Sequence, residues 1–176
     1  NNNNNNNWIY NIQNKNKQIL KKERDIISMR IITKYNSNLY NKSKDLYHTE
    51  GLEIAKKLHL VAISSKNCVG LAHNQIGGDK SVFVAKIDNK WKYFINPTII
   101  STSSKSHTMP ESCMSFPNKY NNVKRYLEIE LQHQVKARND NNGNAFITEK
   151  FKGMNAIIIQ HEIDHLNGKT IFCNNK

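Results

Sequence analysis

One apolar-rich segment near the end of the chain, Gly153–Leu166, constrains the fold most, because it carries two histidines and a glutamate. An Asn-Gly pair follows it directly as a typical helix stop, so we expect a helix here. His161 and His165 then share one face, where both imidazoles can reach a single divalent ion. Glu162 lies beside that ion, where its carboxylate can take a proton from water. An unpartnered Glu in a buried helix is costly, which argues against a chance pattern.

A third metal ligand has to come from another part of the chain. Zinc proteases with the same pentapeptide take theirs downstream, either from a distant Glu or from a His six residues after the second His. Here that sixth position is Ile171, and Cys173 is the only downstream candidate, beyond the predicted helix end. We therefore expect an upstream ligand, and the candidates are Cys68, His73, His107, Glu111, Cys113 and His133.

The first 28 residues differ from the rest of the chain. Seven consecutive Asn precede a stretch rich in Lys, Asn and Gln, which is typical of a disordered extension. The stretch has no apolar core, so it is not a secretory signal, although a basic organelle-targeting remnant is an alternative. We place one folded domain at residues 29–176.

The pattern within that domain predicts antiparallel strands between two helices, an α+β class. A Gly-punctuated loop, a typical ligand-approach element, should follow the first helix. The expected elements are a helix at 43–64, strands at 81–87, 91–95, 98–101, 126–135 and 145–148, a turn at 140–143, and a helix at 153–166.

Composition excludes several classes of protein. The apolar runs are far shorter than the ~20 residues of a membrane-spanning helix, and three cysteines are too few for a disulfide scaffold. The net charge of +12 favours nucleic acid as a partner, but the basic residues are scattered and only four of the 26 are Arg. We expect a soluble protein of a reducing compartment that binds no DNA and associates with the ribosome only transiently.

Three short motifs give the chain its resemblance to peptide deformylases. That family carries, in order, a GxGLAAxQ loop, an EGCxS segment and a QHExDHLxG helix. The corresponding segments here are CVGLAHNQ at 68–75, ESCMS at 111–115 and QHEIDHLNG at 160–168. The third motif is complete, the second lacks its Gly, and weaker likeness runs from about Met29 to Ile171.

The resemblance implies a fold and a metal centre. Antiparallel strands would pack around the metal-binding C-terminal helix. Cys113, His161 and His165 would hold one divalent ion, which is Fe(II) in typical members, with zinc, nickel or cobalt as substitutes. A carboxylate cluster would orient these ligands, and its members by the family pattern are Glu111, Arg125 and Asp164.

The resemblance also implies a reaction, hydrolysis of the N-formyl group from the N-terminal methionine of newly synthesised polypeptides. Glu162 would move the proton from water to the leaving amine, and the Gln75 amide and Met114 backbone N–H would stabilise the oxyanion. The implied location is the cytoplasm, or a plastid or mitochondrial matrix if residues 1–28 are a targeting remnant. The expected substrate-binding residues are Val69, Gly70, Leu71, Met154, Ile157 and Ile158.

Three departures from the family motifs leave alternatives open. Cys68 and Ser112 replace glycines, so we expect their bulk to narrow the entrance to the site, whereas His73 replaces an Ala and is expected to be a bystander. The alternatives to deformylation are a metallopeptidase of other specificity and a catalytically impaired, deformylase-like binding module.

Overall fold

The computed structural model describes residues 14–15, 17–18, 30–136 and 145–173. The chain divides into two compact units, residues 1–30 and 31–176, and the second contains every element described below. Of the extension predicted at 1–28, only residues 14–15 and 17–18 are described, and these are helical. The turn predicted at 140–143 lies outside the described residues.

The second unit places its antiparallel strands between two α-helices, so the predicted α+β class is confirmed. Its elements, in chain order, are η1 (Ser37–Tyr40), α2 (His48–Ser64), β1 (Gly70–Ala72), η2 (His73–Ile76), β2 (Val82–Ile87), β3 (Lys90–Thr102), β4 (Ser106–Cys113), β5 (Phe116–Tyr126), β6 (Glu128–Val135), β7 (Ala145–Lys152) and α3 (Gly153–Leu166).

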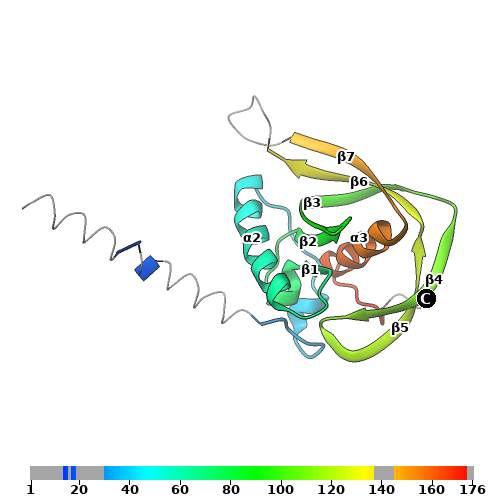
Figure 1. Ribbon diagram of the computed structural model, residues 1–176, viewed down its shortest axis with the longest axis horizontal. Coiled ribbons are helices and arrows are strands. Elements are labelled where there is room, and N and C mark those ends of the chain that lie inside the picture. The colour runs from blue at the N-terminus through cyan, green and yellow to red at the C-terminus, as the bar shows by residue number, and fades with distance from the viewer. Residues whose placement is uncertain (1–13, 16, 19–29, 137–144, 174–176) are drawn as a thin grey trace, which may run out of the picture. The chain divides into compact units, whose positions relative to one another are not determined.

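The strands form two antiparallel sheets, a five-stranded one in the order β1-β2-β3-β6-β7 and the two-stranded β4-β5. In β6, Ile129 and Leu131 are buried while Glu128 and Gln132 are exposed, as the alternating sequence predicts. Figure 1 shows α3 beside the large sheet, with the β4–β5 hairpin extending past it. Helix α3 thus lies between the five-stranded sheet and the β4–β5 hairpin, which carries the ESCMS motif.

Several elements differ from their predicted bounds. The two strands predicted at 91–95 and 98–101 are one continuous β3, whose register shifts next to Pro97, a residue without an N–H. Helix α2 begins at His48, five residues later than expected. The strands β4 and β5 were not predicted, because their mostly polar sequences show little apolar alternation.

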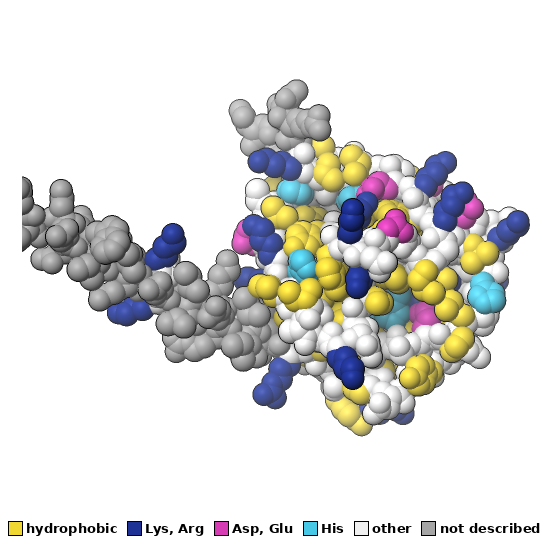
Figure 2. All heavy atoms as spheres, in the orientation of Figure 1, with side chains coloured by type: hydrophobic (Ala, Val, Ile, Leu, Met, Phe, Trp, Pro, Cys, Tyr) yellow, Lys and Arg dark blue, Asp and Glu magenta, His cyan; other side chains and the backbone are white. Residues whose placement is uncertain are grey.

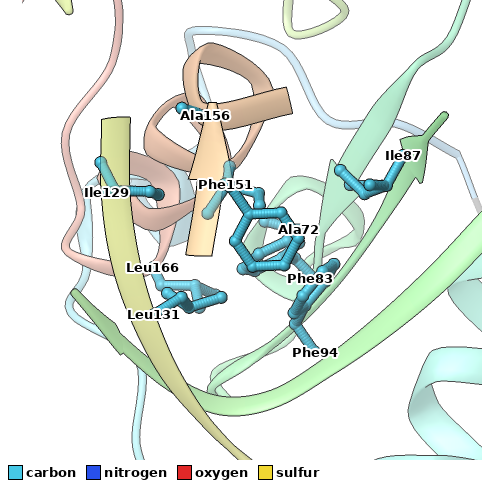
Figure 3. Packing of buried hydrophobic residues seen from close by; sticks show 11 residues of the cluster. Ala72, Phe83, Ile87, Phe94, Ile129, Leu131, Phe151, Ala156 and Leu166 are labelled. Atoms are coloured by element: carbon cyan, nitrogen blue, oxygen red, sulfur yellow. The ribbon is translucent and has the colours of Figure 1, made fainter. Parts of the chain in front are cut away.

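The core of the large sheet is aromatic. Phe83 and Phe94 stack with ring centroids 4.6 Å apart, and Phe151 meets Phe94 edge-on at 5.9 Å (Figure 3). Ala156 and Ile159 bring the inner face of α3 against this cluster. The helix that carries the His-Glu motif is therefore fixed by burial along one side.

On the face that Figure 2 shows, the basic side chains of the described residues are not gathered into one patch. Figure 2 shows Lys and Arg side chains spread over the visible face, with carboxylates between them. Among the described residues, no helix combines the length and apolar character needed to cross a membrane.

Candidate active site

The helix α3 and the end of β4 bring three metal-ligating side chains together. The Nε2 atoms of His161 and His165 are 3.2 Å apart, and the Sγ of Cys113 lies 3.2 Å from Nε2 of His165. All three donor atoms lie within 4.8 Å of one another, the one such group among the described residues. Cys113 is therefore the upstream candidate that joins the two histidines.

Of the other upstream candidates, Glu111 contacts His161 at Nδ1, on the opposite side of the ring from the donor Nε2, and the remaining four have other partners or are exposed. Cys68 lies 3.2 Å from the carbonyl of Gly70, and His133 pairs with a glutamate on β7. His73 accepts a hydrogen bond from the backbone N–H of Lys80, and His107 is exposed on β4.

The three donors fit a divalent ion. Ligand bonds of ordinary length in a tetrahedral site would put two imidazole nitrogens about 3.3 Å apart and a sulfur and a nitrogen about 3.6 Å apart. The observed nitrogen–nitrogen distance of 3.2 Å is close to the first value, and the sulfur–nitrogen distance of 3.2 Å is about 0.4 Å shorter than the second. A thiolate with two imidazoles suits zinc, iron, nickel or cobalt, so the donor set alone does not select the ion.

The two histidines have opposite electrostatic surroundings. Burial holds the pKa of His165 well below its usual value, so this imidazole stays neutral and free to ligate. Burial also lowers the pKa of His161, but hydrogen bonds to Cys113 and Glu111 outweigh it and raise that pKa to about 10. Metal binding at this group therefore displaces a proton.

A buried ionic cluster supports His161. Its Nδ1 lies 2.9 Å from Oε2 of Glu111, which also forms a bidentate pair with Arg125 at 2.7 and 2.9 Å. Arg125 reaches Asp164 on α3 at 2.5 Å. Burial raises the pKa of Glu111, but its hydrogen bonds to Arg125 and His161 lower it overall to about 2. The cluster ties β4, β5 and the ligand helix together through one guanidinium.

Glu162 stands in the protein interior with one oxygen unpaired. Its side chain is 3% exposed, and Oε2 has no hydrogen-bond partner. Burial, together with the negative charges of Glu111 and Asp164, raises the pKa of Glu162 to about 7. A Cβ at Gly70 would overlap the Glu162 carboxylate, so the backbone of β1 can pass here only as glycine.

Gln75 and the turn after Cys113 complete the polar wall. Gln75 is buried, and its Oε1 accepts from the N–H of Ala72 at 2.9 Å. Its Nε2 donates to Ser115 Oγ at 3.2 Å and lies 3.7 Å from Cys113 Sγ. Met114, in the same turn, lines the cavity described next.

A cavity of about 200 Å³ opens onto Cys113 and His161, two of the three metal-ligating residues. Five of the six expected substrate-binding residues line it, and the sixth, Leu71, is fully buried and does not. Three lining residues were not predicted. The expected residues are Val69, Gly70, Met154, Ile157 and Ile158, and the unpredicted ones are Asn67, Met109 and Pro110.

Comparison with known proteins settles the family. The family model described as polypeptide deformylase matches residues 28–175. The chain belongs to the peptide deformylase family. A peptide deformylase of Borreliella burgdorferi is 36% identical over 143 residues, which cover 80% of this chain and 77% of that relative.

Two Thermotoga proteins extend the comparison. The peptide deformylase of Thermotoga neapolitana is 38% identical over 103 residues, 58% of this chain and 59% of the relative, so the match spans less than two thirds of that protein. The crystal structure of the peptide deformylase from Thermotoga maritima superposes with a TM-score of 0.74 at 25% identity, covering 84% of this chain and 97% of that one.

The three departures from the deformylase motifs have distinct surroundings. Cys68 is buried and does not line the cavity, so it does not narrow the entrance as we expected. Ser112 is exposed and lines the cavity. The His73 ring lies against Gly78, where a Cβ would overlap it, and accepts from the N–H of Lys80. This histidine therefore contacts its own loop and not the metal ligands.

Proposed function

We propose that this protein hydrolyses the N-formyl group from the N-terminal methionine of newly synthesised polypeptides. One observation carries the proposal: Cys113 and His161, two members of the three-donor group, line the same cavity as Glu162, whose Oε2 has no hydrogen-bond partner. Membership of the peptide deformylase family supports the same reaction.

Cys113, His161 and His165 are the residues that would hold the metal. When bound, a divalent ion supplies Lewis acidity, which acidifies water and polarises a carbonyl. We infer Fe(II) from the family resemblance, with zinc, nickel or cobalt as substitutes. The Glu111, Arg125 and Asp164 cluster keeps the His161 ring in place through its Nδ1.

Glu162 moves the proton. With a pKa of about 7, its carboxylate accepts a proton from the attacking water and returns it to the leaving amine near neutral pH. The C–N bond of the formamide breaks, a C–O bond forms, and formate and a free amino terminus leave. The Nε2–H of Gln75 and the backbone N–H of Met114 donate to the oxyanion that develops on the formyl oxygen.

The apolar side of the cavity would receive the methionine side chain. Ile157 is buried there, while Val69 and Met154 are about half exposed at the rim. An unbranched thioether suits such a wall. The exposed rim leaves room for the rest of the peptide, and Ser112 would meet the residue beyond methionine.

We further propose the setting of the reaction. Formyl-methionyl nascent peptides are the partners, with at most transient ribosome association. The reaction takes place in the cytoplasm, or in an organelle matrix if residues 1–28 are a targeting remnant. Residues 29–176 form the catalytic domain.

Two peptides separate deformylation from its alternatives. Metal-loaded protein is incubated with formyl-Met-Ala and with a longer peptide that has a free amino terminus, and formate and cleavage products are measured. We expect formate from the first and no cleavage of the second. Internal cleavage without formate would establish a metallopeptidase, and absence of both activities would leave a binding module.

The variant Glu162→Gln tests the assigned proton carrier. We expect loss of formate release with metal still bound, because Glu162 does not belong to the donor group. Glu130→Gln is the matched control, since Glu130 pairs with exposed Lys150 and does not line the cavity. Equal activity of Glu162→Gln and the parent would show that the mechanism is wrong.

A further inference from the structure

Each of the three metal-donor residues is contacted by a buried polar side chain from another element. The motifs predict such a contact for two of them and not for His165. Gln75 lies against Cys113, and Glu111 holds His161. Asn74, the neighbour of Gln75 in η2, is fully buried, and its Nδ2 donates to the backbone carbonyl of His165.

The same amide reaches a second element. Nδ2 of Asn74 also lies 3.2 Å from the carbonyl of Leu39 in η1. The last carbonyls of a helix lack partners within it, and the His165 carbonyl is bonded by Asn74 as well as by the N–H of Gly168 at 2.9 Å. The Asn74 side chain thus links the C-terminal turn of α3 to η1 and η2, and it does so at His165, which carries one of the metal-donor atoms.

Two unpaired atoms lie on the same two residues. Asn74 Oδ1 and His165 Nδ1 are both buried without a hydrogen-bond partner. His165 directs Nε2 at Cys113 and His161, so ligation through Nε2 leaves the proton on Nδ1. A ligating imidazole normally donates that proton to an oxygen, and Asn74 carries an unused one.

We propose that Asn74 is a positioning residue for the metal ligand His165. Its amide nitrogen holds the backbone of His165, and its oxygen is the acceptor available to the imidazole Nδ1–H once Nε2 is ligated. The η2 turn then serves two donors through consecutive residues, Asn74 for His165 and Gln75 for Cys113. The inference rests on the proposed function only in requiring a metal at this group.

The test compares two asparagines that make the same kind of bond. Asn74→Leu keeps the side-chain volume and removes both polar atoms. Asn121→Leu is the control, because the Asn121 amide donates to the carbonyl of Ile171 at 2.6 Å and does not contact a donor residue. Both full-length variants and the parent are titrated with Co²⁺ anaerobically, with visible absorption reporting thiolate and imidazole ligation.

We expect Asn74→Leu to weaken Co²⁺ binding by roughly 10- to 100-fold and to alter the absorption bands, since outer contacts of metal ligands have effects of this size. Asn121→Leu should bind like the parent. If circular dichroism shows that Asn74→Leu is unfolded, Asn74→Ser replaces it with the same expectation. Parent-like affinity and spectrum in the folded Asn74 variant would overturn the proposal.

This readout separates the inference from the proposed function. A parent that binds Co²⁺ but releases no formate would refute deformylation while leaving the role of Asn74 standing. A parent that releases formate, with an Asn74 variant that binds Co²⁺ unchanged, would refute the positioning role alone.

Discussion

Gly70→Ala should impair catalysis without removing the metal. The new Cβ would overlap the carboxylate of Glu162, which is almost fully buried and has no solvent to retreat into. To regain an ordinary contact, the carboxylate must move by about 1 Å. A displacement of that size at a reacting group costs on the order of 10²-fold in rate, equivalent to about 2.7 kcal/mol of activation free energy.

The assay is the rate of formate release from formyl-Met-Ala, with metal content measured on the same samples. Gly77→Ala, at the end of η2, is the matched control: its φ of 88° strains any side chain, but nothing lies within 4 Å of a Cβ there. We expect it to lower stability by about 1 kcal/mol and leave the rate unchanged. A Gly70→Ala enzyme as fast as Gly77→Ala would refute the assignment of Glu162 as proton carrier in this position.

Three further predictions concern stability and thiol chemistry. Arg125→Met removes the guanidinium that pairs with buried Glu111 and partly buried Asp164, and should lower the free energy of unfolding in urea by about 3–5 kcal/mol. Lys150→Met, which breaks an exposed ion pair, should lower it by less than about 1 kcal/mol, and equal effects would contradict the role of the cluster. The pKa of Glu111 is about 2 in the folded protein against an ordinary value of 4.5, so its contribution to the free energy of unfolding, about 3 kcal/mol, is complete above pH 4.5 and is lost as the pH falls toward 2. Thermal melts should show this loss of stability, and Glu111→Gln should abolish it. Burial, with the charge of Glu162, raises the pKa of Cys68 to about 12, so iodoacetamide should label exposed Cys173 well before Cys68. Mass spectrometry of timed samples measures the order, and labelling of Cys68 first would contradict the burial of Cys68.

The sequence predicts the ligand helix well. The apolar-rich run and the Asn-Gly stop predict a helix at Gly153–Leu166, and the observed helix has the same bounds, with Gly168 at a φ of 69°. The reason is physical, because a buried helix must repeat its apolar face every turn and must end where the chain turns left-handed. The four-residue spacing of His161 and His165 then places both on one face of this helix.

The third donor and its supports depend on tertiary structure. Spacing left six upstream candidates for the metal, and only the meeting of β4 with α3 distinguishes Cys113 from the others. Strands β4 and β5 bury Glu111 and Arg125 as an ion pair, so their pattern is polar where a strand prediction looks for apolar alternation. No sequence pattern predicts the role of Asn74, since its hydrogen bonds are to backbone carbonyls of residues distant in the sequence.

Anaerobic metal analysis of Cys113→Ala tests the central claim most directly. The parent, purified and loaded with Fe²⁺ under the same conditions, should retain one ion per chain, and Cys68→Ala, which removes the other buried thiol, should retain the same amount. Cys113→Ala should lose it. Stoichiometric metal in Cys113→Ala, or its loss in Cys68→Ala alone, would contradict the assignment of the metal centre.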